Sequence, residues 1–329
     1  MILEPMNQVL TFSHGLMLPL TRACGAECSY CTFKSDQTTL LTFDEIETLI
    51  RTYQASGAYE VVLMSGQSLD EIPGFSDQWL ARGFSSFTEY LRDVCQLVLE
   101  HQMLPTLDVG PLTYAQLETL APFITSITLL LENVNLDFMA TVQSNKRIDD
   151  KIETMNDAAH FRIPVNTGLL IGAGEALDDA FATLQTIEEL SQRLQTIQSV
   201  KIQCVVTPNR KDPPITPEVL SLLSKYSHKL MPDVPVIISH SSPVAWWEYQ
   251  GVLVDDIGPL FEGLDGLEWT KNQPKVTEVQ RELAKHGWTL RPRLPIFEKH
   301  FDDSFQSDIV RDVLAQWTSQ REFSSYRNN

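Results

Sequence analysis

Three of the five cysteines lie within eight positions, in the stretch LTRACGAECSYCTF (20–33), with the spacing Cys24-x3-Cys28-x2-Cys31. Structural zinc sites usually have four protein ligands in two separated pairs, and this segment offers only three thiols. A disulfide between two of these cysteines would leave one thiol over. Three thiolates suit three irons of a four-iron cluster, which leaves the fourth iron open to a substrate or cofactor. We therefore interpret the segment as a candidate catalytic metal centre.

The overall composition narrows the class of protein. The chain has 329 residues, of which 43% are hydrophobic, so we expect a substantial core rather than wholesale disorder. The formal net charge of -18 would repel phosphate backbones, which argues against duplex nucleic acid as a partner. The sequence contains no run of about 18 apolar residues, so we expect no membrane-spanning helix and no membrane partner.

The cysteines also bear on the compartment. An odd number of cysteines, three of them clustered, is not the pattern of a secreted disulfide framework. The stretch MILEPMNQVLTFSHG at the start lacks the basic and apolar regions of a signal peptide. We therefore expect a cytoplasmic location.

Apolar runs of strand length alternate with helical patterns along most of the chain. The predicted strands span residues 15–20, 60–66, 104–110, 126–132, 163–172, 200–206 and, as a seventh, 234–239. The predicted helices between them span residues 42–57, 85–101, 113–121, 147–161, 176–194 and 216–230. Strands that are apolar on both faces and alternate with helices indicate a parallel sheet. Six or seven such units predict an α/β fold, a complete or partial TIM-type β/α barrel, with a doubly wound open sheet as the alternative.

The last quarter of the chain follows the pattern less closely. The alternation loosens from about residue 243, although helical patterns recur near 275–286 and 305–318. We interpret residues 1–240 as the barrel core and residues 241–329 as a C-terminal extension packed on the same domain.

Polar residues collect at the carboxyl ends of the predicted strands, which in a barrel form one rim where sites are built. These residues are Ser65, Gly66, Gln67, Asp108, Glu132, Asn166 and Gln203. The cysteine segment follows the first predicted strand, so we expect it on the same rim.

The cysteine segment, with Tyr30 directly before the third cysteine, resembles the signature of the radical S-adenosylmethionine (SAM) superfamily. The resemblance implies that Cys24, Cys28 and Cys31 hold a [4Fe-4S] cluster whose free iron binds SAM. It also implies that one electron from the cluster cleaves SAM to methionine and a 5'-deoxyadenosyl radical, while the protein orients and shields the cofactor.

Three further stretches resemble SAM-binding parts of that superfamily. GLLIGAGE, with Gly168, Leu170 and Gly172, resembles a segment whose backbone approaches the adenine, and MSGQ (64–67) resembles one that holds the SAM amino group. Glu132 stands where similar enzymes have a SAM-binding carboxylate. The alternatives are ordinary glycine turns for the first two stretches, and a salt bridge to a barrel lysine for Glu132.

Longer segments resemble, in order, the radical subunit family of the 7,8-didemethyl-8-hydroxy-5-deazariboflavin synthases. They include LPTLDVGPLTYAQLETLAP, IPVNTGLLIGAGE, IQSVKIQCVV and WTLRPRLPIF, and the resemblance covers residues of about 14–300. It implies a lyase-type cyclisation in which a hydroxybenzyl-ribitylaminouracil adduct loses ammonia and becomes a deazaflavin. It further implies a small-molecule substrate, a reductant such as flavodoxin or ferredoxin, and a companion radical SAM subunit that makes the adduct.

Several family motifs on the substrate side are changed. The differing segments are SGQSLDEIP after the second strand, Asp108-Val109-Gly110 after the third, MATVQSNKRIDDK (139–151) after the fourth, and GLEWTKNQP (266–274). Lys151 stands where the family has an arginine, which binds carboxylates differently. Two alternatives therefore stay open, namely a related enzyme with another ring- or amine-bearing substrate, and a non-catalytic iron-sulfur protein.

The remaining candidates could contact a substrate. Asp108, Asn166 and Lys146 are the predicted catalytic residues, with Gln203, Asp255 and Asp256 as further pocket groups. The alternatives are that Lys146 and the two aspartates are solvated surface charges, and that Asn166 and Gln203 satisfy each other. Trp246 and Trp247 either cover a pocket or simply pack.

Overall fold

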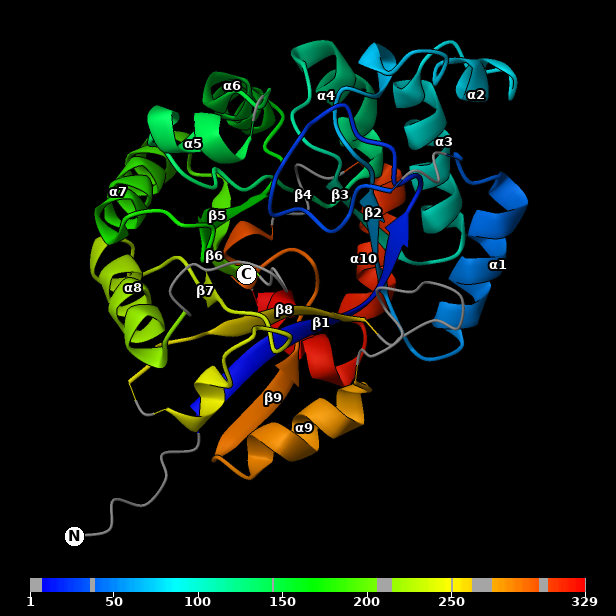
Figure 1. The fold of residues 1–329 in the computed structure, drawn as a ribbon. Coiled ribbons are helices and arrows are strands. Elements are labelled where there is room, and N and C mark those ends of the chain that lie inside the picture. Colours follow the sequence, from blue (N-terminus) through cyan, green and yellow to red (C-terminus); the bar gives the residue numbers. More distant parts are fainter. Residues whose placement is uncertain are drawn as a thin grey trace, which may run out of the picture.

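The computed structural model describes residues 8–35, 39–143, 145–205, 215–249, 251–261, 274–301 and 307–328. Its architecture is a ring of parallel strands surrounded by helices, as Figure 1 shows. The strands of the ring are β1 (Gln8–Pro19), β2 (Glu60–Met64), β3 (Leu104–Asp108), β4 (Ser126–Thr128), β5 (Val165–Ile171), β6 (Ile197–Cys204), β7 (Val236–Ile237) and β8 (Asp256–Phe261). A ninth strand is β9 (Trp288–Pro292).

Helices follow most of the strands along the chain. They are α1 (Phe43–Gln54), α2 (Asp77–Leu80), α3 (Phe87–Glu100), α4 (Tyr114–Leu120), α5 (Leu136–Val142), α6 (Ile148–His160), α7 (Leu177–Leu194), α8 (Pro217–Leu230), α9 (Val276–Ala284) and α10 (Asp308–Thr318). Short 3-10 helices are η1 (Leu69–Glu71), η2 (Ala121–Phe123), η3 (Trp246–Glu248), η4 (Glu298–His300) and η5 (Arg321–Asn328).

Strand β1 closes the barrel because it pairs with three other strands. Its first residues pair with β9, its middle with β8 and its last residues with β2, all in parallel. The strands β1 to β8 therefore form a closed ring, and β9 is attached outside it. The predicted β/α barrel is confirmed and is complete, and the open sheet is excluded.

The structure also differs from the predicted elements in detail. The eighth strand, β8, lies in the segment assigned to the extension, and its sequence DIGPLF contains glycine and proline, which are unfavourable in strands. Strand β1 begins seven residues earlier than predicted, at Gln8, because β9 supplies a partner for its exposed first residues. Strand β7 shrinks to two residues. The capping box of α1 forms at Thr42 and Glu45, but the helix ends at Gln54, before Gly57.

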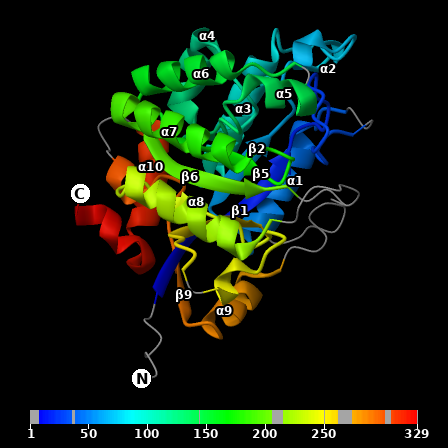
Figure 2. The same cartoon turned by 60° about the vertical axis from the view of Figure 1, so that its left-hand side comes forward.

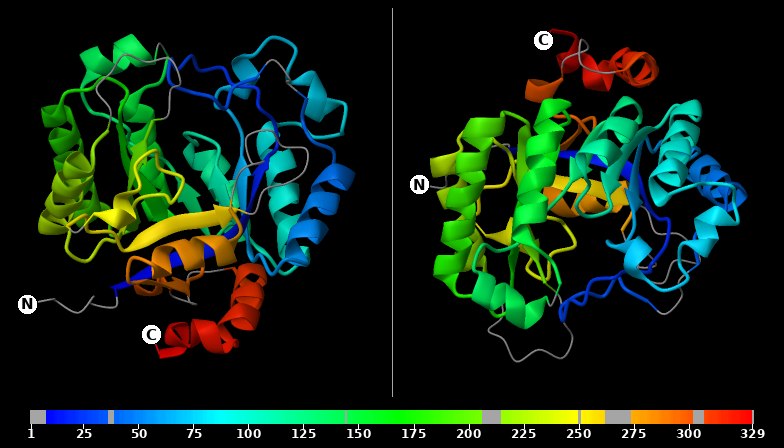
Figure 3. Two further views of the ribbon diagram at one scale, coloured as in Figure 1. Left: turned by 60° about the horizontal axis from the view of Figure 1, so that its bottom comes forward. Right: turned by 90° about the horizontal axis from the view of Figure 1, so that it is seen from above.

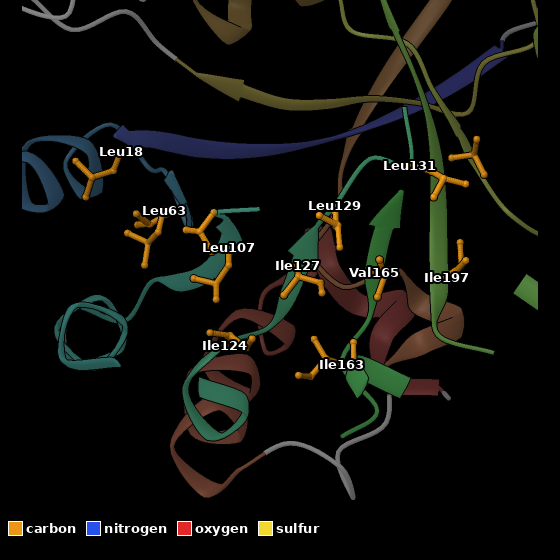
Figure 4. Close-up of a cluster of buried hydrophobic side chains, with 14 of the residues drawn as sticks. Leu18, Leu63, Leu107, Ile124, Ile127, Leu129, Leu131, Ile163, Val165 and Ile197 are labelled. Atoms are coloured by element: carbon orange, nitrogen blue, oxygen red, sulfur yellow. The ribbon is translucent and has the colours of Figure 1, made fainter. Parts of the chain in front are cut away.

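One row of side chains shows how the strand period separates core from lumen. The residues in register across six neighbouring strands are Leu18, Leu63, Leu107, Ile127, Val165 and Ile197, all buried and drawn in Figure 4. They belong to the main hydrophobic core. The alternate residues, such as Val62, Asp108, Thr128 and Asn166, line a cavity inside the ring. The polar residues noted at the strand ends are therefore on the lumen side.

The C-terminal segment covers the amino end of the barrel. A second hydrophobic cluster connects residues at the start of β2 and β3 with α10 and η5. It consists of Tyr59, Leu99, Leu104, Leu294, Ile296, Val310, Val313, Leu314 and Phe323. Figures 2 and 3 show this red segment at the end of the molecule away from the dark-blue chain that follows β1. The carboxyl rim is left for the site.

A buried charge cluster lies at the same amino end. The guanidinium of Arg293 donates to both carboxylate oxygens of Asp256, from Nε at 2.6 Å and from Nη2 at 2.9 Å. The buried carboxylate of Glu60 accepts hydrogen bonds from Ser13 and, at 2.8 Å, from Thr106. Burial raises the pKa of Glu60, and the charge of Arg293 opposes that rise.

This pairing predicts a large stability effect. Arg293→Met would leave the carboxylate of Asp256 buried without its partner, so we expect the free energy of unfolding to fall by about 3–5 kcal/mol in urea titrations. Arg291→Met is the matched control, because the Arg291 side chain is 51% exposed and its salt bridge to Glu298 spans 3.4 Å. We expect it to cost less than about 1 kcal/mol. Equal losses in the two variants would contradict the assigned role of the buried pair.

Candidate functional site

The cysteine segment follows β1 at the carboxyl rim, as predicted. Its backbone is fixed by Ser29 N, which donates to Val142 O at 2.9 Å, and by a bridge between Cys28 and Gln143. On its other side, Gly25 N donates to Gln67 O at 2.9 Å. The segment is therefore held between the end of α5 and the turn after β2.

Gly66 allows this close approach. A Cβ atom at Gly66 would lie 2.1 Å from Ala23 O and 2.4 Å from the Cβ of Cys24, which no side chain could accept. The hydroxyl of Ser65 donates to Gly66 O at 2.8 Å. Gly66 and Gln67 thus touch the cysteine segment directly, with Ser65 beside them, and the predicted neighbourhood of MSGQ and the cysteines is present.

The three thiols open into one cavity of about 560 Å³, whose lining also includes Lys34 and Gln143. A single zinc ion bonded to sulfur at about 2.3 Å would bring its ligands within about 4 Å of one another. The three sulfur atoms do not all lie within 4.8 Å of one another, so their arrangement does not fit one ion. Three separated thiols around one open cavity fit the larger, multi-iron group that the sequence predicts.

A buried carboxylate stands beside the cysteines. Glu132 accepts a hydrogen bond from the Tyr30 hydroxyl at 3.2 Å and from the Gln143 amide at 2.5 Å. Lys151 Nζ lies 2.6 Å from Glu132 Oε2, and Lys146 Nζ lies 3.1 Å from Oε1. Burial alone would raise the pKa of Glu132, but the ammonium groups of Lys151 and Lys146 lower it to about 2.

The two lysines bear on the sequence hypotheses for this carboxylate. The alternative of a salt bridge to a lysine describes what the structure shows for Glu132, while its predicted contact with SAM stays a prediction. Lys146 is mostly buried, so it is not the solvated surface charge that was the alternative for it. Lys151, in the position of the family's arginine, does bind a carboxylate here, that of Glu132.

The glycine stretch on β5 holds the backbone of Glu132 in place through hydrogen bonds. Glu132 has a φ of +71°, in the left-handed region that costs a non-glycine residue about 1–2 kcal/mol. Glu132 N donates to Gly168 O at 3.0 Å, and Leu170 N donates to Glu132 O at 2.9 Å. A Cβ atom at Gly168 would lie 1.9 Å from Lys201 O, so this glycine permits the close pairing of β5 with β6. Gly172 lies further along, where its N–H donates to Glu175 at 2.7 Å.

The lumen of the barrel forms a second cavity, of about 230 Å³. Its lining includes the predicted residues Asp108, Asn166 and Gln203, together with Lys201, which sequence reasoning did not single out. Burial raises the pKa of Asp108 and lowers that of Lys201, and in each case the charge of the other residue opposes the shift. A lysine within the apolar run VKIQCVV was the signal that could have identified it, because a charge inside a buried strand needs a reason.

Other predicted pocket groups do not reach this rim. Asp256, at the start of β8, pairs with Arg293, and Asp255 pairs with His228 at 2.9 Å. Both aspartates therefore belong to the opposite end of the barrel, so their assignment to the pocket was wrong. Asp256 is not a solvated surface charge, because its side chain is fully buried against Arg293, whereas the side chain of Asp255 is 45% exposed.

Two more alternatives are settled by contacts. Asn166 Oδ1 accepts hydrogen bonds from Ser199 and Gln198, whereas Gln203 donates to Cys204 O, so Asn166 and Gln203 do not satisfy each other. The two tryptophans pack. Trp246 is fully buried, and Trp247 stacks on His240 with ring centroids 4.5 Å apart.

The part of the chain that the structure describes contains no helix long and apolar enough to cross a membrane. The segment 266–274, whose departure from the family pattern was noted, lies almost entirely outside the described residues.

Comparisons with known proteins agree with the fold. No family model matches the chain. The chain is 28% identical over 324 residues to the 7,8-didemethyl-8-hydroxy-5-deazariboflavin synthase of Methanothermobacter thermautotrophicus, which covers 93% of this chain and 97% of that protein. It is 27% identical over 329 residues to the synthase of the same name from Nostoc sp., covering 95% of this chain and 93% of that protein.

Solved structures share the barrel at much lower identity. HydG, a maturase of the [FeFe]-hydrogenase, matches with a TM-score of 0.71 at 12% identity, over 97% of this chain and 82% of that one. Methylornithine synthase (PylB) matches with a TM-score of 0.66 at 15% identity, over 88% of this chain and 84% of that one. Streptococcus suis SuiB bound to S-adenosylmethionine matches with a TM-score of 0.54 at 12% identity, over 96% of this chain and 68% of that one. The predicted barrel is confirmed, and so is the predicted resemblance to the deazariboflavin synthases over nearly the whole chain.

The cysteine cavity predicts a specific metal dependence. After anaerobic reconstitution with iron and sulfide, Cys28→Ala should lose the visible absorption of an iron-sulfur cluster and most bound iron, because it removes one of three thiols around the cavity. Cys95→Ala is the matched control, since Cys95 is fully buried within α3 and should leave the iron content unchanged. Retention of a full cluster by Cys28→Ala would refute the ligand assignment.

Proposed function

We propose that the chain uses Cys24, Cys28 and Cys31 to hold a [4Fe-4S] cluster with SAM on its open iron. The observation that carries the proposal is the set of three separated thiols around one open cavity at the carboxyl rim. When bound, the cluster and SAM supply a carbon-centred radical through one-electron cleavage of SAM. The full-length similarity to the deazariboflavin synthases supports the same chemistry.

The charges around the cavity suit an anionic, thiolate-bound group. Lys146 interacts through space with both Cys24 and Cys28, and Lys34 lines the cavity. Because Lys146 and Lys151 share the single carboxylate of Glu132, the cluster of three side chains retains an excess of positive charge. Such a charge stabilises the ligated thiolates. Tyr30 and Gln143 hold Glu132 in place, which positions both lysines.

The SAM-binding residues follow from the backbone around the cysteines. We assign Ser65, Gly66 and Gln67 to the amino-acid part of SAM, because Gly66 and Gln67 touch the cysteine segment. Gly168, Leu170 and Gly172 on β5 are assigned to the adenine, with Glu132 between the two groups. The backbone hydrogen bonds of Glu132 to Gly168 and Leu170 support this grouping, because they join two of the three segments.

The lumen is the substrate chamber in this proposal. It adjoins the cysteine site, because Asp108, which lines the lumen, interacts electrostatically with Lys146 beside the cysteines as well as with Lys201 in the lumen. We propose that the substrate is the hydroxybenzyl-ribitylaminouracil adduct, which loses ammonia and closes to a deazaflavin. Asp108, Asn166 and Lys146 are the groups assigned to bind the reacting part and move its protons.

A different substrate for the same machinery is the second candidate. The observation that favours it is the altered segment 139–151, which here supplies Gln143, Lys146 and Lys151 to Glu132. A relative with another ring- or amine-bearing substrate would keep the cysteine site and change such segments. A non-catalytic iron-sulfur protein is a third possibility and would bind SAM without cleaving it.

The remaining components follow from the chemistry. A one-electron donor such as flavodoxin or ferredoxin must reduce the cluster, and a companion radical SAM subunit must supply the adduct. We place all of them in the cytoplasm, where thiols stay reduced.

The proposal predicts two products. The reconstituted enzyme, given a reductant, SAM and the hydroxybenzyl adduct, should form 5'-deoxyadenosine together with a fluorescent deazaflavin, both measurable by liquid chromatography. Cys28→Ala should form neither, because its cluster is lost.

Three outcomes separate the candidates. Cleavage of SAM with an unchanged adduct would favour the different-substrate candidate. A fully loaded cluster that yields no 5'-deoxyadenosine, with or without the adduct, would favour the non-catalytic protein. Formation of both products establishes the cyclisation.

A further inference from the structure

Two ionisable side chains of opposite sign, each partly accessible, line the lumen without an ion-pair partner among the described residues. Asp108 ends β3, and Lys201 lies within β6, three strands further around the ring. Both side chains line the same cavity. The described residues offer neither side chain a hydrogen bond or a close ion pair, and their charges interact only through space.

Their surroundings differ from those of the buried charges of the barrel. Glu132 has two lysines in contact, Asp256 has an arginine, and Glu60 has two hydroxyl donors. Charged side chains that open into a partly enclosed cavity without an ion-pair partner are candidates for contact with a ligand. Asp108 and Lys201 are therefore available to a ligand in this cavity.

We propose that Asp108 and Lys201 select the substrate by charge, so that the lumen binds a small molecule carrying both an amine, held by Asp108, and an acidic group, held by Lys201. The inference rests on the proposed function, because it names the substrate class of the same chamber. It makes Lys201 a specificity-determining residue. A substrate that releases ammonia has an amine to offer Asp108.

The other walls fit such a ligand. Apolar side chains line much of the cavity, including Val62, Ile237 and Leu260, so a ring would be accommodated between the two charges. The amide of Asn166 is held by Gln198 and Ser199 and adds a fixed polar group. A cavity of about 230 Å³ admits one small molecule and no polymer. Complementary charges on both sides give specificity for molecules that carry both groups.

The test uses the reconstituted full-length enzyme with three probes that share a phenyl ring. L-phenylalanine carries both charges, phenethylamine only the positive charge, and 3-phenylpropanoate only the negative one. By isothermal titration calorimetry, the wild type should bind phenylalanine about tenfold more tightly than either analogue. Lys201→Met should abolish the preference over phenethylamine, and Asp108→Asn should abolish the preference over 3-phenylpropanoate.

Gln203→Met is the matched control, because Gln203 lines the same cavity from the same strand without a charge. It should change the three affinities together and keep their order. A wild type that binds none of the probes, or all three equally, would overturn the inference, and this result needs no variant to fold. Cleavage of SAM in the same preparation tests the proposed function separately, since loss of charge preference with intact cleavage rejects only the inference. The reverse result rejects only the proposed function.

Discussion

The site is organised by the groups that compensate the negative charge of one buried carboxylate, that of Glu132. Glu132 lies at the carboxyl rim with a left-handed backbone, and an ionised carboxylate there would be unfavourable without partners. Its partners come from three different segments, with Tyr30 in the cysteine segment, Gln143 after α5 and Lys151 in α6. The hydrogen bonds that satisfy the charge therefore also fix where the cysteines lie relative to β5. Removing any one partner would disturb both.

The electrostatic character of the two cavities differs in a consistent way. Around the cysteines, lysines outnumber carboxylates and every buried charge is in contact with an opposite one. In the lumen, Asp108 and Lys201 stay apart, and the pKa of each shifts toward the neutral form. The first region is suited to a permanently held anionic group, and the second to a ligand that comes and goes. The same barrel thus combines a site whose charges are paired with a site whose charges are not.

The sequence was most informative where local spacing determines geometry. The cysteine spacing, the glycine at position 66 and the alternating strands indicated the rim, the cysteine centre and the barrel, since these depend on neighbours along the chain. Partners that are distant in sequence could not be found in this way. The pairing of Glu132 with Lys146 and Lys151 depends on the path of residues 139–151, and that of Asp256 with Arg293 on the return of β9 to β1. Strand β8 was missed because glycine and proline hide it, although its register with β1 closes the ring.

The closed amino end of the barrel affects how ligands enter and leave the lumen. The hydrophobic cluster of α10 and η5, together with the charge cluster of Arg293, covers the start of β2 and β3, so the described residues close the lumen at its amino end. The cysteine segment lies at the opposite end, on the carboxyl rim. A ligand that enters the lumen from the rim therefore passes a cofactor held there, and it exchanges less freely while that cofactor is bound. Such an arrangement favours ordered binding and release, and it keeps a reactive species away from bulk water.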